Sequence, residues 1–211
     1  MEIGRIIQTE ASVQEGAEWL AQREARFAEA LAATGPLPLR RRQDGFEALL
    51  SAVVSQQLSV SAADGIWRRL EASGLIAPEA IVRTHEEDLR ACGLSRPKIR
   101  YAKGLAESGL DFEALRSLPN DAVVAELTAL KGIGKWTAEI YAMASLGRAD
   151  VFAAGDLALQ ESARILFRLK DRPTEKELDQ MAADWSPWRS VAARLLWAYY
   201  RVAKNREGIR S

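Results

Sequence analysis

The sequence predicts an all-α protein, and three observations support this fold class. The 211 residues are rich in Ala, Leu, Arg and Glu, which are strong helix formers. Apolar residues recur at intervals of three and four, as in Phe46, Leu49, Leu50, Val53 and Val54. No segment shows the strand–turn–strand alternation of a β-hairpin, whereas Gly, Pro and Asn mark short loops. We therefore expect helices joined by short connections.

Prolines and charge pattern set the expected helices of the N-terminal half. The first 35 residues hold six Glu against three Arg, which predicts one or two surface helices that end at the GPLP segment, residues 35–38. Pro78 and Pro97 each suit the first turn of a helix, where the missing N–H costs nothing. After residue 45 we expect helices at residues 46–58, 61–72, 79–82, 85–92 and 96–107.

Glycines and helix caps divide the C-terminal half. Residues 131–134, KGIG, predict a tight turn between two helices, and residues 150–155 predict a connector. Thr174 followed by Glu177 is the capping-box pattern of a helix start. We expect helices at residues 121–129, 136–146, 157–169, 174–183 and 188–204.

Composition excludes several classes of protein. The single cysteine, Cys92, excludes a disulfide framework and any Cys-ligated zinc or iron–sulfur site. With 29 basic and 29 acidic side chains the net charge is zero, so a nucleic-acid partner must rest on local features. The first 20 residues lack a basic start followed by an apolar run, and no stretch approaches the ~18 apolar residues of a membrane helix. We expect a cytoplasmic protein with no membrane partner.

The stretch LKGIGKWTA, residues 130–138, is the most informative one. Gly132 and Gly134 surround Ile133, so the backbone amides of the turn can face one way without a Cβ in front of them. The next helix begins there, and its free N–H groups and positive end favour a phosphate. Lys135 adds charge, and Ile133 is expected to plug into the core. A simple corner between two helices explains the two glycines equally well.

Asp156 follows Gly134 by 22 residues and directly precedes an expected helix. Its ordinary role is that of an N-cap. A functional interpretation is a carboxylate that the helix holds in its ionised form at a cleft, where it can stabilise a developing cation. The nearby Asp150 is equally well a solvated loop charge.

The ordered set of motifs resembles the helix–hairpin–helix (HhH-GPD) DNA glycosylase superfamily, and most of all its AlkA-type 3-methyladenine DNA glycosylases (glycosylase II). The match runs from about Phe46 to Trp197. The stretches that carry it are LKGIGKWTA, DVFAAGDLALQ, SQQLS at 55–59, GLSRPKIR at 93–100, and WSPWRS at 185–190 with Trp197. The resemblance implies two helical lobes with the active site in the cleft between them. One lobe spans about 46–150 with the hairpin at 130–135, and the other combines about 1–45 with 151–211.

The resemblance also implies roles for individual residues. Asp156 aligns with the family's catalytic aspartate. Gln57, with Leu58 as the neighbouring candidate, falls at the side chain that enters the minor groove. The expected phosphate-binding residues are Gly132, Ile133, Gly134, Lys135 and Thr137. The expected base pocket comprises Trp136, Trp197 and Tyr141, the last of which is adjacent to the position of a pocket tyrosine in relatives.

The activity that the resemblance implies is hydrolysis of the N-glycosidic bond of alkylated purines, such as 3-methyladenine and 7-methylguanine, in duplex DNA. Bifunctional, endonuclease III-like relatives place a lysine where this chain has Trp136, so we expect base excision without strand cleavage. The protein is expected to act as a monomer and to require no cofactor. Relatives often hold a monovalent cation at the hairpin, and the carbonyls of Thr128, Leu130 and Ile133 would bind Na⁺ or K⁺ here.

Two alternatives remain open at this point. One is a non-catalytic helix–hairpin–helix DNA-binding module, which explains the glycines but leaves Asp156 idle. The other is a bifunctional glycosylase/lyase that uses a nearby lysine. A basic stretch is also open to two interpretations, since it could follow a phosphate backbone or form a solvated helix face. Its residues are Arg90, Arg96, Lys98, Arg100 and Lys103.

Overall fold

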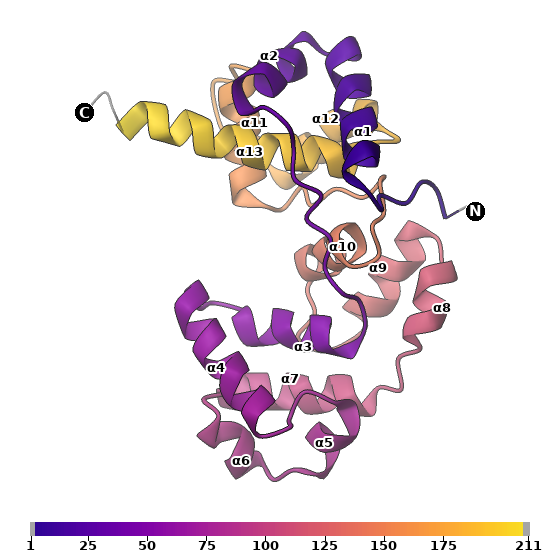
Figure 1. The fold of residues 1–211 in the computed structure, drawn as a ribbon, viewed down its shortest axis with the longest axis vertical. Coiled ribbons are helices and arrows are strands. Elements are labelled where there is room, and N and C mark those ends of the chain that lie inside the picture. Colours follow the sequence, from indigo (N-terminus) through magenta and orange to yellow (C-terminus); the bar gives the residue numbers. More distant parts are fainter. Residues whose placement is uncertain (1–2, 209–211) are drawn as a thin grey trace. The chain divides into compact units, whose positions relative to one another are not determined.

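The computed structural model describes residues 3–208, which form helices and short connections (Figure 1). The prediction of an all-α protein is confirmed. Within the described residues, β-type pairing is limited to an isolated antiparallel bridge between Ile6 and Arg148. None of the helices in residues 3–208 combines the length and the apolar character needed to cross a bilayer.

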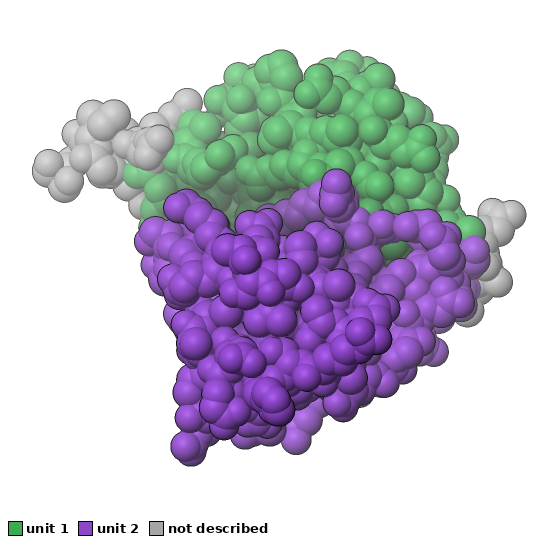
Figure 2. Space-filling view, turned by 60° about the horizontal axis from the view of Figure 1, so that its bottom comes forward, with its two compact units in different colours: residues 1–41, 142–211 green, residues 42–141 purple. Residues whose placement is uncertain are grey.

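The chain divides into two compact units (Figure 2). Unit 1 comprises residues 1–41 and 142–211, and unit 2 comprises residues 42–141. The corresponding boundaries expected from the sequence were about 46 and about 150.

Unit 2 is built on helix α3, which packs against α4 and α7, while α7 also packs against α5 and α6. Its core consists of aliphatic side chains that are fully buried, among them Leu50, Val53 and Ile99. The short helix α8 was not expected from the sequence. The helices are α3 (Phe46–Ser55), α4 (Val60–Ala72), α5 (Pro78–Arg83), α6 (Glu86–Ala91), α7 (Arg96–Glu107), α8 (Phe112–Ser117), α9 (Asn120–Thr128) and the first part of α10 (Lys135–Ala144).

Unit 1 is built on the long helix α13, which packs against α1, α2 and α11. Helix α1 approaches it closely at Gly16, where a Cβ would lie 2.7 Å from Trp188 and Val191. The aromatic ring of Trp185 contacts Phe27 edge-on and stacks on Phe167. The remaining elements are α1 (Glu10–Arg23), α2 (Ala25–Thr34), α11 (Leu157–Leu166), α12 (Glu175–Ala182), the 3-10 turn η1 (Ala183–Trp185) and α13 (Arg189–Gly208).

Two helices end three residues earlier than the sequence suggested, and a non-glycine residue just beyond each of them takes a left-handed backbone conformation. Helix α3 ends at Ser55, since Gln57 has a φ of 57°, and α11 ends at Leu166, since Arg168 has a φ of 56°. A positive φ cannot continue a right-handed helix. The expected capping box is confirmed, because Thr174 and Glu177 exchange both hydrogen bonds at the start of α12.

The N-terminal segment pairs with the chain just before residue 150. The Ile7 N–H donates to Gly147 O, and the Ala149 N–H donates to Arg5 O. Arg148 is almost fully buried here and donates from Nη1 to Ile3 O over 3.1 Å. Burial lowers the pKa of Arg148. This pairing fixes the point from which residues 150–155 depart toward Asp156.

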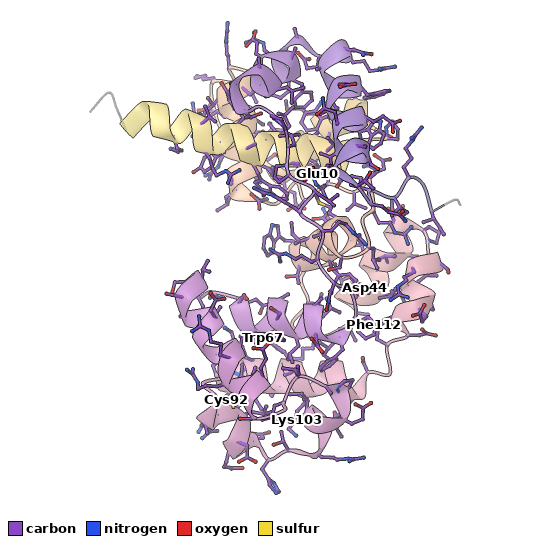
Figure 3. The ribbon with its side chains drawn as sticks, viewed as in Figure 1. Glu10, Asp44, Trp67, Cys92, Lys103 and Phe112 are labelled. Atoms are coloured by element: carbon purple, nitrogen blue, oxygen red, sulfur yellow. The ribbon has the colours of Figure 1, made fainter. Side chains whose placement is uncertain are left out.

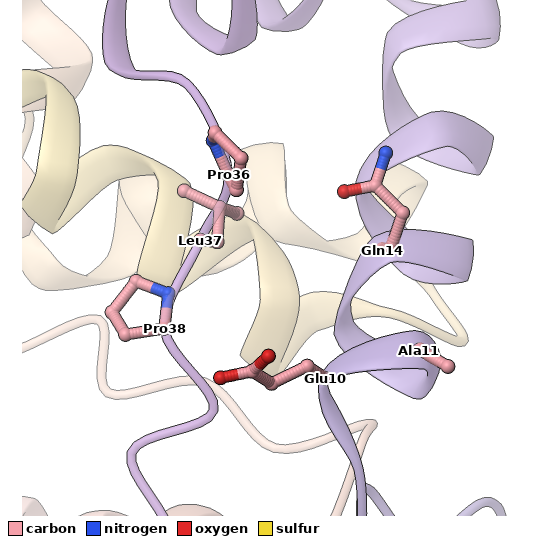
Figure 4. A pocket seen from close by; sticks show the side chains of 6 residues that line it. All are labelled: Glu10, Ala11, Gln14, Pro36, Leu37 and Pro38. Carbon is pink, nitrogen blue, oxygen red and sulfur yellow. The ribbon is translucent and has the colours of Figure 1, made fainter.

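Two surface hollows lie away from the predicted site residues. One, of about 410 Å³, separates helix α1 from residues 36–38, and Glu10 and Gln14 are among its lining residues (Figure 4). The other, of about 460 Å³, is lined by Arg69, Asp88 and the buried Cys92, among others. Neither hollow includes a residue that the sequence assigned to DNA or base binding.

Candidate functional site

The turn between α9 and α10 has the architecture that its sequence predicts. Ile133 is buried at 4% exposure, while its neighbours Lys131 and Gly134 are exposed. The Ile133 N–H donates to Leu130 O at 3.0 Å, and the Ala138 N–H donates to Gly134 O at 3.0 Å as α10 begins. The turn is thus anchored in the core by Ile133, while Lys131 and Gly134 reach the surface.

The two glycines of this turn are required for different reasons. Gly132 has a φ of 95°, and a Cβ there would lie 2.7 Å or less from three ring carbons of Tyr101, so the protein's own fold excludes a side chain. At Gly134, no atom of the described residues lies within 4 Å of a Cβ position, and φ is not in the left-handed region. The fold itself therefore leaves open space at Gly134.

Three further predicted residues follow on the first turns of α10. Lys135 Nζ lies 3.5 Å from Oε1 of the buried Glu139. Trp136 is a large apolar side chain that remains 47% exposed, whereas Thr137 is buried. An exposed indole next to the turn has a large flat surface for stacking.

Gln57 and Leu58, the candidates for the side chain that enters the minor groove and hereafter the wedge residues, lie on the connection between α3 and α4. Gln57 is exposed, and Leu58 is 39% exposed. Val60, which begins α4, is 79% exposed. The connection and the first residue of α4 therefore present Gln57, Leu58 and Val60 to the surface of unit 2.

Tyr141, which the sequence placed in the base pocket, is buried at 4% exposure. Its hydroxyl oxygen accepts the Gly45 N–H at 2.8 Å and so holds the N-terminus of α3. Burial raises the pKa of Tyr141 from its ordinary value of 10 to about 12. The side chain thus has a structural contact in addition to the role predicted for it.

Replacement of Tyr141 by Phe is expected to lower the free energy of unfolding by about 1–3 kcal/mol, because the Gly45 N–H loses its acceptor. The difference in free energy of unfolding between the parent and Tyr141→Phe should depend on pH. Above pH 10 the unfolded chain ionises Tyr141 while the folded chain keeps it protonated, so its contribution to stability declines up to about pH 12. Urea unfolding across this range should show the gap between parent and variant narrowing. A gap that stays constant would contradict the assignment.

Asp156 is the N-cap of α11 in unit 1 and is partly exposed. Its Oδ1 accepts two backbone hydrogen bonds, from Ala158 N at 2.8 Å and Leu159 N at 3.0 Å. The positive end of the helix favours negative charge at this point. The predicted N-cap is confirmed, and the carboxylate is held in place without being sealed in the interior.

The connector before Asp156 is rigid because it is anchored along its length. Arg189 grips the Asp150 carboxylate through Nε at 2.7 Å and Nη2 at 3.1 Å, so Asp150 is not a simple solvated charge. Ala153 and Ala154 are fully buried, and the buried Gln160 donates from Nε2 to Ala154 O at 2.9 Å. The Asp156 N–H itself donates to Ala153 O.

Trp197 lies on α13 and is partly exposed. The Arg40 guanidinium carbon lies 5.8 Å from the centre of its ring, a cation–π distance. Burial, with the nearby charges of Arg40 and Arg41, lowers the pKa of Arg194 to about 10. The Trp197 ring therefore lies beside the Arg40 guanidinium of unit 1.

Two residues of the basic stretch are committed to main-chain carbonyls. Lys98 Nζ donates to Val54 O at 2.7 Å, and burial lowers its pKa. Lys103, on α7 (Figure 3), donates to Ile81 O and Thr84 O at the end of α5. Arg90, Arg96 and Arg100 are exposed.

Several positioning contacts were not foreseen. The Gln56 amide donates from Nε2 to Gly132 O at 2.8 Å, across 76 residues of sequence, and nothing local indicates that partner. The same holds for Lys98 and Val54, which are 44 residues apart. The contact of Gln160 could have been anticipated, because an amide on the buried face of an amphipathic helix needs a hydrogen-bond partner.

Comparison with known sequences places these residues in context. The profile of the family described as "HhH-GPD superfamily base excision DNA repair protein" matches residues 50–187. DNA-3-methyladenine glycosylase 1 of Schizosaccharomyces pombe is 35% identical over 178 residues, which cover 80% of this chain and 78% of the relative.

Several solved structures are also similar to this chain. The DNA-3-methyladenine glycosidase of Bacillus halodurans superposes with a TM-score of 0.82 at 34% identity, covering 90% of this chain and 91% of that one. The 3-methyladenine DNA glycosylase of S. pombe, in complex with abasic DNA, superposes with a TM-score of 0.75 at 34% identity, covering 87% and 95%. The hairpin, the wedge connection and Asp156 all lie within the matched residues 50–187.

Proposed function

Because this chain belongs to the HhH-GPD superfamily of base excision DNA repair proteins, we propose that it is a monofunctional DNA glycosylase. It hydrolyses the N-glycosidic bond of alkylated purines, of the 3-methyladenine and 7-methylguanine type, in double-stranded DNA. The observation that carries the proposal is Asp156, a partly exposed carboxylate held by two amides at the positive end of α11.

Asp156 is suited to the charge that develops when the base departs. The deoxyribose becomes electron-poor as the glycosidic bond breaks, and a fixed carboxylate stabilises that positive charge. Because Oδ1 is held by the amides of Ala158 and Leu159, the group needs no reorganisation at the moment of reaction. An alkylated purine is already cationic and therefore a good leaving group, so little help from a general acid is required.

Several residues of unit 2 are suited to binding the DNA duplex. The turn at Gly132 and Gly134 is proposed to bind a backbone phosphate, since the fold leaves the space at Gly134 open. Gln57 and Leu58 are proposed to replace the extruded nucleotide in the stack, and both are exposed. Trp136 and Trp197, with Tyr141, remain the predicted base-pocket residues, and a cationic base on an indole face would gain roughly 0.5–2 kcal/mol.

Excision without strand cleavage agrees with the contact made by Lys135, the lysine that precedes Trp136. A lyase needs an uncharged amine that attacks the sugar, and Lys135 instead forms an ion pair with the buried Glu139. We therefore expect that borohydride traps no covalent adduct with DNA. An adduct would favour a bifunctional glycosylase/lyase.

A monovalent cation at the turn is part of the proposal. The donor set is three neutral main-chain oxygens, those of Thr128, Leu130 and Ile133, which suits Na⁺ or K⁺ better than a divalent ion. The Leu130 carbonyl already accepts the Ile133 N–H and retains one lone pair for an ion. Such an ion would add positive charge near the bound phosphate. The protein is proposed to act as a monomer.

The test is mass analysis of the bases released from methylated duplex DNA. Release of 3-methyladenine or 7-methylguanine, leaving intact strands with abasic sites, is the expected result. Binding to DNA with no base released would identify a non-catalytic DNA-binding module instead.

A further inference from the structure

A hydrogen bond links the connection between α3 and α4, which carries the wedge residues, to the turn that is proposed to bind a phosphate. Gln56, the C-cap of α3, donates from Nε2 to Gly132 O at 2.8 Å, and the two residues belong to the same unit. From this contact we infer that Gln56 is a positioning residue that sets the distance between the wedge, Gln57 and Leu58, and the turn. This inference rests on the proposed function.

Helix α7 contacts both segments that this hydrogen bond joins, namely the end of α3 and the turn. Lys98 and Tyr101 are three residues apart on α7 and therefore lie on one face of it. Lys98 Nζ donates to Val54 O at 2.7 Å, at the carboxyl end of α3 where a cation is favoured. The Tyr101 ring packs against Gly132, leaving no room for a Cβ. The wedge connection and the turn thus rest on one rigid element.

The wedge itself is held in a strained conformation. Gln57 has a φ of 57°, and a non-glycine residue in this region carries a cost of order 1–3 kcal/mol that its surroundings must offset. The residues on both sides are fixed, since Gln56 is held by Gly132 and the Ser59 Oγ accepts the Ala62 N–H to cap α4. The Gln57 side chain is therefore presented to solvent by an ordered backbone.

This arrangement predicts which step depends on Gln56. The turn can bind a phosphate without the wedge residues. Replacement of a base, in contrast, requires the wedge residues to lie at a set distance from that phosphate. Loss of the tie should therefore impair extrusion of the nucleotide and leave affinity for the duplex largely intact. A residue that merely stabilises the fold would affect both.

The experiment is a double-mutant cycle between Gln56→Met and Gln57→Ala. Extrusion is followed by the fluorescence of 2-aminopurine placed beside a target nucleotide that keeps its base but has a non-hydrolysable glycosidic bond. The fluorescence rises when the extruded base no longer stacks on the 2-aminopurine. Loss of one hydrogen bond predicts an extrusion rate about tenfold lower for Gln56→Met, with duplex affinity within about twofold of the parent. The double variant should match Gln57→Ala alone, because Gln56 acts through the wedge.

Gln180→Ala changes an exposed glutamine on α12 of unit 1 and should leave extrusion unchanged. Additive losses in the double variant, or equal losses in affinity and extrusion, would overturn the inference. If thermal unfolding shows that Gln56→Met is not folded, Gln56→Glu serves instead, because it keeps the shape of the side chain and removes the Nε2 donor. Failure of the parent protein to release bases would count against the proposed function alone, since fluorescence reports extrusion without excision.

Discussion

Replacement of Asp156 by Asn should lower the rate of base excision by about 10³-fold while DNA affinity and fold stability remain those of the parent. At ~4 Å and an effective dielectric constant of about 20, a carboxylate stabilises a developing unit charge by roughly 4 kcal/mol, which corresponds to on the order of 10³ in rate. Asn keeps the side-chain oxygen that accepts the amides of Ala158 and Leu159, so the cap survives. Single-turnover excision and duplex affinity are the measurements.

The chain offers a matched control for this change. Asp111 is also an N-cap, since its Oδ1 accepts the Ala114 N–H at 3.0 Å at the start of α8 in unit 2. Asp111→Asn makes the same chemical change at a cap of the same kind and should leave excision unaffected. Full activity in Asp156→Asn would remove Asp156 from the chemistry.

Replacement of Gly134 by Leu should weaken DNA binding at least about tenfold for every sequence, with no loss of thermal stability, because the turn is proposed to contact only the phosphate backbone. The protein itself has room for the new side chain, since no atom of the described residues lies within 4 Å of the Cβ position. Duplex affinity on several unrelated sequences and the melting temperature are the measurements.

Gly132→Ala is the matched comparison, two residues away in the same turn. At Gly132 a side chain is disfavoured by the φ of 95° and would clash with the Tyr101 ring. The free energy of unfolding should therefore fall by about 1–3 kcal/mol or more. Weakened binding that is confined to particular DNA sequences, or equal destabilisation by both substitutions, would contradict this account of the two glycines.

Features that depend on neighbours in sequence were predicted well. The buried Ile133, the capping box at Thr174 and Glu177 and the N-cap at Asp156 all follow from hydrogen bonds or spacings within a few residues. The unexpected elements were also local in origin. Helix α8 begins at an Asp N-cap that was not recognised in the sequence, and the early end of α3 coincides with a left-handed φ at Gln57, a residue type that rarely adopts one.

The sequence by itself therefore determined the all-helical class, the turn with two glycines and the carboxylate at the start of α11, since each depends on short-range backbone geometry. Tertiary structure alone decided that Gln56 meets Gly132, that Lys98 meets Val54 and that Arg189 holds Asp150. Those partners lie between 39 and 76 residues apart, and which side chains meet depends on how whole helices pack. Periodicity tells which face of a helix is buried, but it does not tell what that face will touch.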